Sequence, residues 1–186
     1  ISTDAVFAGS SDKPPFCENS VVEPIGIYGI TKKEGEVKCF INNPNAIIVR
    51  TNFFGWSPLR TSILEFFVDK LNARSECFGY TDYKVSSIYA PDLADNLINL
   101  ACSSLNGLFH LASPQSLSKY EFAISVAKVF GFDHRLIKPT QVNGKYGLEH
   151  RANDLSLDVS NFESTFNTRL PTTYEGIIKA YLDRPV

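Results

Sequence analysis

The chain has 186 residues, of which 44% are apolar and 20% charged, enough for a globular domain with a hydrophobic core. Its formal net charge of −2 and pI of about 5.9 argue against nucleic acid or an acidic membrane surface as a partner. No apolar run approaches the ~20 residues that span a bilayer, and no signal-peptide pattern opens the chain.

The four cysteines predict free thiols. Cys17, Cys39, Cys77 and Cys102 are widely scattered, and no C-x-x-C motif occurs. We therefore predict no metal site and a reducing compartment, which favours a cytoplasmic protein.

Residues 1–7 are typical of a strand end followed by a loop. The sequence contains no methionine, even at residue 1. A native start inside a core strand would be unusual, so we expect the sequence to be part of a longer protein.

After a loop over residues 9–24, the stretch Tyr28-Gly29-Ile30-Thr31-Lys32 predicts the start of a helix that runs to about Ile41. Tyr28 and Lys32 are four residues apart and share one helix face. A free phenol has a pKa of about 10, and a nearby cation lowers it, so the pair is a candidate proton donor and acceptor. Alone, Tyr-x-x-x-Lys is a weak signal, because both residues are common on helix surfaces.

Gly35 lies inside this predicted helix. Glycine there costs about 1 kcal/mol relative to alanine. A close approach of a neighbouring helix or strand would explain it, and we predict such a contact at Gly35.

Residues 46–50 form a continuous, mostly β-branched run. This pattern favours a strand buried on both faces, as in a parallel sheet. Residues that follow a parallel strand usually line a ligand crevice, which makes Thr51, Asn52 and Phe53 candidate site residues.

The rest of the chain predicts alternating helices and short strands. A helix is expected to start at Ser57-Pro58 and to bury an apolar stripe over residues 63–71. A capping box at Ser118 and Glu121 predicts a helix that ends at Gly131. His110 lies in a predicted strand without other metal ligands nearby, so we interpret it as structural. Further elements are predicted by local patterns: helices from 90 and over 174–182, and strands over 107–112 and 136–139.

Three segments carry a resemblance to a known family. "STDAVFAG", "YGITKKEGE" and "VRTNFFG", in this order and spacing, resemble the extended short-chain dehydrogenase/reductase family. Within that family, the segments look most like the dTDP-4-dehydrorhamnose reductase group. The match covers most of the chain and is best from Ile1 to about Ser125.

The resemblance implies an α/β fold: the C-terminal part of an NAD(P)-binding Rossmann-type parallel sheet with a smaller α+β substrate-binding lobe. Residues 1–56 would be the remainder of the Rossmann-type domain with the Tyr-x-x-x-Lys helix. Residues 57–186 would be mainly the substrate-binding lobe, with segments that return to the sheet. The glycine-rich dinucleotide motif of the family is absent from these 186 residues, so the nucleotide-binding half is expected upstream.

The implied activity is reduction of a nucleotide-linked 4-keto-deoxysugar with NADPH or NADH, as in dTDP-rhamnose biosynthesis. The resemblance also admits a homodimer. It carries over three sets of residues: catalytic Thr3, Tyr28 and Lys32; cofactor-binding Ser2, Tyr28, Lys32, Thr51 and Asn52; and substrate-binding Thr3, Asp4, Phe53, Trp56 and Arg151.

Several of these assignments have plain alternatives. The Thr3 hydroxyl would otherwise bond local backbone, and Asp4 would cap the following turn. Phe53 stands where the group often has tryptophan; Trp56 would supply the aromatic face instead, or pack on the core as a loop residue. Arg151 would bind a pyrophosphate or form a surface salt bridge.

Two other functions remain open. An epimerase or dehydratase of the same fold uses the same Tyr, Lys and Ser/Thr, although a dehydratase usually has Asp-Glu where this chain has Asp4-Ala5. A non-catalytic subunit, like the regulatory subunit of methionine adenosyltransferase, would keep the fold without the reaction.

Overall fold

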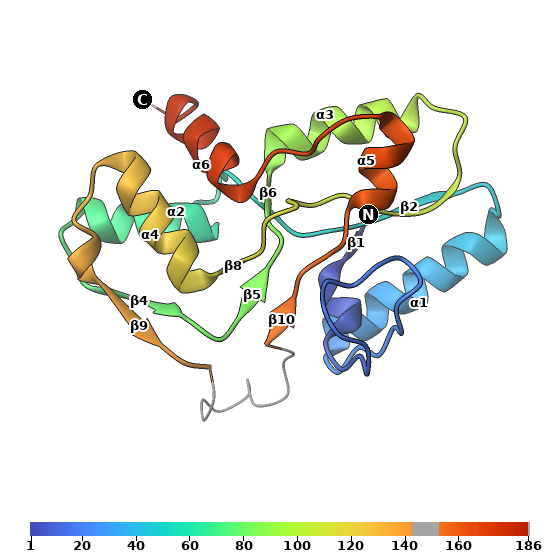
Figure 1. Cartoon of the computed structure of the whole chain (residues 1–186), viewed down its shortest axis with the longest axis horizontal. Coiled ribbons are helices and arrows are strands. Elements are labelled where there is room, and N and C mark those ends of the chain that lie inside the picture. Colours follow the sequence, from blue (N-terminus) through green and yellow to red (C-terminus); the bar gives the residue numbers. More distant parts are fainter. Residues whose placement is uncertain (143–152, 186) are drawn as a thin grey trace.

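The computed structural model describes residues 1–142 and 153–185, and it has the predicted α/β architecture (Figure 1). Its central sheet contains β1 (Ser2–Thr3), β2 (Ile47–Thr51) and β7 (Gly107–His110), all parallel, in the order β1-β2-β7. The predicted strand over residues 46–50 is thus confirmed. Ile48 and Val49 on β2 are both buried, so this middle strand is covered on both faces.

The 3-10 helix η1 (Asp4–Phe7) follows β1, and α1 (Ile27–Asn42) packs against both elements. The α1 bounds agree closely with the predicted helix. Its close contact is at Gly29, where an added Cβ would lie 2.6 Å from the Ala5 carbonyl oxygen. The prediction for Gly35 is wrong, because no atom lies within 4 Å of a Cβ built there. Gly35 faces outward, where nothing packs against it.

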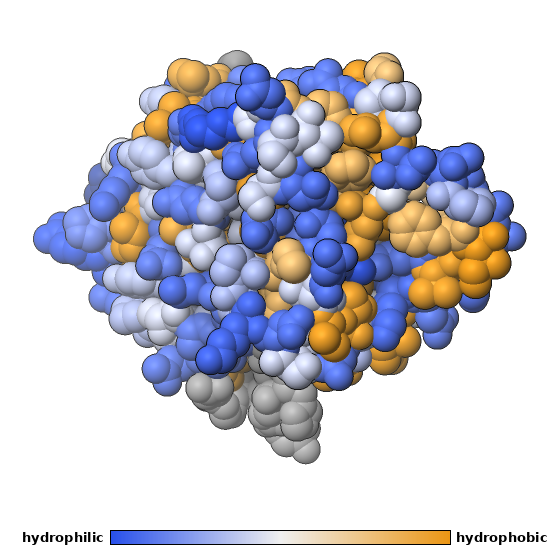
Figure 2. Space-filling model, turned by 45° about the vertical axis from the view of Figure 1, so that its right-hand side comes forward, coloured by the Kyte–Doolittle hydropathy of each residue, from blue (hydrophilic) through white to orange (hydrophobic). Residues whose placement is uncertain are grey.

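Most of α1 stays at the surface. Gly29 and Glu36 are its buried residues, while Ile27, Val37 and Ile41 are exposed. Figure 2, which brings the α1 side of the molecule forward, shows apolar surface there among polar side chains. The helix is therefore fixed by a close backbone contact and polar bonds more than by apolar packing.

A second group of elements lies on the other side of the molecule (Figure 1). It contains α2 (Ile63–Asn72), α4 (Lys119–Phe130) and α6 (Thr173–Leu182), with the parallel pair β4 (Cys77–Tyr80) and β9 (Ile137–Thr140). The predicted start of α2 at Ser57-Pro58 is wrong. The Ser62 hydroxyl accepts from the Glu65 amide and Glu65 accepts in return from Ser62, so the capping box sets the first residue. The predicted box at Ser118 is confirmed, as is the helix end at Gly131, with φ of 74°.

Short elements connect the two groups. The strand β5 (Lys84–Val85) pairs with β10 (Asp154–Leu155) in parallel and with β8 (Leu117–Ser118) in antiparallel orientation. The strand β3 (Phe53–Phe54) pairs in parallel with β6 (Ile88–Tyr89), which runs directly into α3 (Ala90–Ala101). The remaining elements are η2 (His134–Leu136) and α5 (Ser160–Phe166).

Two hydrophobic clusters form the core. One surrounds the central sheet and includes Phe7, Val49 and Leu111; the other fills the space among α2, α4 and α6 and includes Phe67 and Ile177. Within the described residues, no helix is both long and apolar enough to cross a membrane. All four cysteines are unpaired, as predicted.

Candidate functional site

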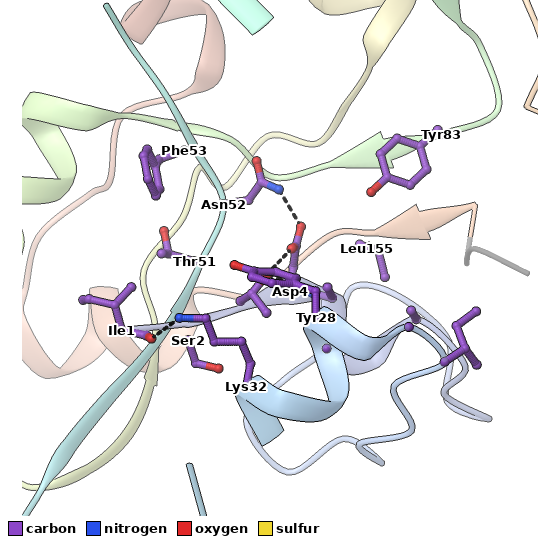
Figure 3. A pocket seen from close by; sticks show the side chains of 16 residues that line it. Ile1, Ser2, Asp4, Tyr28, Lys32, Thr51, Asn52, Phe53, Tyr83 and Leu155 are labelled. Carbon is purple, nitrogen blue, oxygen red and sulfur yellow. Dashed lines mark hydrogen bonds between the residues drawn. The ribbon is translucent and has the colours of Figure 1, made fainter. Parts of the chain in front are cut away.

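A cavity of about 830 Å³ opens where β1 and β2 end and α1 begins (Figure 3). This is the carboxyl edge of the parallel sheet, where the strand pattern predicted a ligand crevice. Eight of the residues predicted for the site line the cavity: Ser2, Thr3, Asp4, Tyr28, Lys32, Thr51, Asn52 and Phe53.

The first two turns of α1 supply Tyr28 and Lys32. The Lys32 Nζ lies 5.9 Å from the centre of the Tyr28 ring, so the predicted shared face is confirmed. Lys32 Nζ also donates to the Ile1 carbonyl oxygen at 3.2 Å (Figure 3). Tyr28 is 59% exposed, which leaves its phenol accessible from the cavity.

Two contacts fix α1 against the sheet. The close approach of Gly29 to Ala5 sets the distance between the first turn of α1 and η1. One turn beyond Lys32, the buried Glu36 carboxylate accepts from Arg50 Nε at 2.9 Å and Nη2 at 2.7 Å. The Ser2 hydroxyl donates to the same carboxylate. Ser2 lines the cavity, and its predicted contact with the cofactor stays a prediction.

Thr3 and Asp4 form a buried polar network beneath the cavity. The Thr3 hydroxyl donates to Asp4 Oδ1 at 3.0 Å and accepts from the Ala5 amide at 3.2 Å. Thr3, and not Asp4, is thus the cap of η1. Asn52 Nδ2 donates to Asp4 Oδ2 at 2.8 Å, and the Ser87 hydroxyl donates to Asn52 Oδ1 at 2.6 Å.

Burial raises the pKa of Asp4 to about 6, against the lowering effect of its bonds from Asn52 and Thr3. The charge of Lys119, the first residue of α4, also favours the Asp4 carboxylate. Burial lowers the pKa of Lys119, whereas the charge of Asp4 raises it by a smaller amount. The pKa of Asp4 thus lies well above that of an ordinary aspartate.

The Thr51 hydroxyl and the Phe53 ring are available to bind a ligand in the cavity. Thr51 is buried, and its hydroxyl has no hydrogen-bond partner among the described residues. Phe53 is 57% exposed, so its ring face is open to a ligand.

Trp56 lies outside this cavity. Its indole N–H donates to the Ala180 carbonyl oxygen at 2.8 Å, and its ring packs against Phe130. These contacts correspond to the alternative in which Trp56 packs on the core. The predicted Arg151 lies outside the described residues.

Glu36, Arg50, Ser87 and Lys119, which bond or face the predicted site residues, were not themselves predicted. Glu36 had a local signal, because it follows Lys32 by one helical turn and so lies on the face that meets the sheet. No local pattern indicates the other three.

Comparisons with known proteins point to one family. The sequence model described as the RmlD substrate binding domain matches residues 1–185. A dTDP-4-dehydrorhamnose reductase from Sinorhizobium fredii is 31% identical, and the match covers 95% of this chain and 62% of that protein. Methionine adenosyltransferase 2 subunit beta from Xenopus tropicalis is 27% identical over 88% of this chain and 50% of that protein.

Among solved structures, a dTDP-4-dehydrorhamnose reductase from Bacillus anthracis in complex with NADP superposes with a TM-score of 0.88. It is 25% identical, and the match covers 98% of this chain and 64% of that one. The chain thus spans half to about two thirds of the length of the relatives that it matches.

Proposed function

Because the chain belongs to the RmlD substrate binding domain family, we propose that it carries the catalytic and substrate-binding residues of an NAD(P)-dependent reductase. The proposed substrate is a nucleotide-linked 4-keto-deoxysugar of the dTDP-4-dehydrorhamnose type. Residues 1–56 would serve the cofactor side and residues 57–186 mainly the sugar nucleotide. The free thiols support a cytoplasmic location.

One observation carries the proposal. Thr3, Tyr28 and Lys32, which come from β1 and α1, line a single cavity at the carboxyl edge of the sheet. That set brings a hydroxyl, a phenol and a cation to one small volume. These are the groups that a carbonyl oxygen needs when it becomes an alkoxide.

The residues present fit the nicotinamide end of NADPH or NADH. The Thr51 hydroxyl is buried at the cavity and has no hydrogen-bond partner in the described part of the chain. Lys32 Nζ has two N–H groups beyond the one that bonds Ile1. Thr51, Asn52 and Lys32 would hold the amide and ribose of the bound cofactor. When bound there, the nicotinamide would supply the hydride.

The chain's own residues would manage the charge that develops on the substrate oxygen. Tyr28 donates its phenolic proton to the C4 oxygen as the carbonyl becomes an alcohol. Lys32 stabilises the phenolate that remains, since a nearby cation favours the charged form. Thr3 donates a hydrogen bond to the same oxygen, and Phe53 packs against the sugar face.

The test uses the full-length gene product that carries this chain. We expect it to oxidise NADPH or NADH only when a 4-keto sugar nucleotide is present, measured by the absorbance of the reduced nicotinamide. Tyr28→Phe should lower kcat at least ~100-fold, in line with the loss of general acid catalysis. Tyr174→Phe, at an exposed tyrosine of α6, is the matched control and should keep the wild-type rate. A folded protein without turnover on such substrates would refute the proposal.

The similarity to methionine adenosyltransferase 2 subunit beta supports a second candidate, a non-catalytic subunit. In that case the protein should bind a methionine adenosyltransferase catalytic subunit and change its rate. Keto-sugar turnover should then be absent, and Tyr28→Phe should leave that regulation unchanged.

A further inference from the structure

The Thr3 hydroxyl has only one hydrogen to donate, and Asp4 is its acceptor in the structure. It points to Asp4 Oδ1 at 3.0 Å, inside the fold. One Thr3 lone pair accepts from the Ala5 amide at 3.2 Å, so what remains for the cavity is the second lone pair. In this arrangement Thr3 can accept a hydrogen bond from a ligand but cannot donate one.

The proposed reduction needs the opposite polarity. A substrate carbonyl oxygen, and the alkoxide that forms from it, accept hydrogen bonds. Thr3 can donate to that oxygen only if its hydrogen is released from Asp4. Release is straightforward when Asp4 carries a proton on Oδ1, because the acid then donates to Thr3 and the direction of their bond reverses.

The rest of the network places the acid proton. Asp4 Oδ2 already accepts from Asn52 Nδ2 at 2.8 Å. The Asn52 amide is held in that orientation because its Oδ1 accepts from the Ser87 hydroxyl at 2.6 Å. A proton on Oδ2 would face the Asn52 N–H group, so the proton belongs on Oδ1, toward Thr3.

We propose that Asp4 is a positioning residue whose protonation reverses the Thr3 hydroxyl, so that Thr3 changes from an acceptor into a donor toward the reacting oxygen. This inference rests on the proposed function. Asp4 is 3% exposed and acts through Thr3 without giving its proton to the substrate. The Asp4 proton is kept during turnover, and Tyr28 still supplies the proton that the product gains.

The charges around Asp4 are compatible with this switch. Lys119 on α4 favours the carboxylate, whereas burial favours the acid and dominates, which brings the pKa to about 6. Among the residues that the structure describes, the other ionisable side chains at the cavity are Tyr28 and Lys32 of α1 and Tyr83, which lies near Lys119.

Asp4→Asn provides a direct test, because the asparagine amide imitates the protonated acid. Its Nδ2 can donate to Thr3 while its Oδ1 accepts from Asn52. In the full-length gene product, wild-type kcat should fall about tenfold per pH unit above the pH at which Asp4 loses its proton. Asp4→Asn should change less than about twofold between pH 5.5 and 7.5, because its donor cannot ionise. Asp95→Asn, at an exposed carboxylate of α3, is the matched control and should keep the wild-type profile.

A second measurement does not depend on turnover. Carbon-13 NMR of Asp4 and Thr3 should show the Asp4 carboxyl and the Thr3 side chain titrating together, and Asp4→Asn should abolish the Thr3 titration. If the protein reduces no keto sugar but the two signals move together, the proposed function fails and the hydroxyl reversal stands. If Thr3 does not follow Asp4, or if Asp4→Asn keeps the wild-type pH profile, the inference is overturned.

Discussion

Gly29 and Gly35 lie in the same helix, and we predict that alanine has opposite effects at the two positions. A Cβ at Gly29 would lie 2.6 Å from the Ala5 carbonyl oxygen and 2.9 Å from Pro24 Cβ. A Cβ at Gly35 would meet no atom within 4 Å. The helix must therefore move away from η1 in Gly29→Ala, whereas Gly35→Ala changes only the backbone preference.

The magnitudes follow from these contacts. Alanine in a helix interior gains about 1 kcal/mol over glycine, so Gly35→Ala should raise the free energy of unfolding by about that amount. Gly29 lies in the first turn and gains no more than Gly35, while crowding against rigid backbone costs about 1–3 kcal/mol. Gly29→Ala should thus be less stable than Gly35→Ala by about 1–3 kcal/mol.

Urea unfolding followed by circular dichroism measures this difference directly, and equal slopes in urea would show that the comparison is sound. If Gly29→Ala were as stable as Gly35→Ala, the close approach that sets the position of Tyr28 would be refuted. The matched pair is informative because both substitutions add the same methyl group to the same helix.

Three further predictions concern stability. Arg50→Met should cost about 3–5 kcal/mol because it leaves the Glu36 carboxylate buried and unpaired, and the double variant with Glu36→Leu should recover most of that loss in urea unfolding. Burial lowers the pKa of His110 from 6.5, so the unfolded chain binds more protons and stability should decline as pH falls below that value. The raised pKa of Asp4 has the opposite effect, increasing stability as pH falls from about 6 to 3.8. The stability of the folded protein against pH should therefore be measured in the Asp4→Asn variant. A stability that does not change with pH in that variant would contradict the prediction for His110. Ser62→Ala should cost about 1 kcal/mol through loss of its cap, seen as a lower Tm.

Local signals predicted the elements that depend on local chemistry. The capping box at Ser118 and the left-handed Gly131 fixed both ends of α4, because a cap and a positive φ require particular residue types. The start of α2 was misplaced because Pro58 resembles a first-turn proline, although Ser62 and Glu65 carry the same box signature as Ser118.

In the candidate site too, residues with a local signal were predicted, and residues that depend on the tertiary fold were not. The motif residues Thr3, Tyr28 and Lys32 were predicted and do line one cavity. The sequence did not indicate the hydrogen-bond partners around these residues, because the pairing of the strands brings those partners together. Ser2 lies opposite Arg50 in the β1–β2 pair, which brings both side chains to Glu36. Asn52 reaches Asp4 across 48 residues of sequence, and no local pattern encodes that distance.

The packing of α6 has a consequence for how the chain folds during synthesis. The Trp56 indole bonds to Ala180, 124 residues later, and Tyr89 bonds to Asp183 across 94 residues. At about 5–20 residues per second, Trp56 is synthesised roughly 6–25 s before Ala180. Until α6 emerges, α4 and β6 lack the helix that packs against them. Chaperones that shield exposed apolar surface should therefore bind the nascent chain after α4 has emerged and release it once α6 is complete.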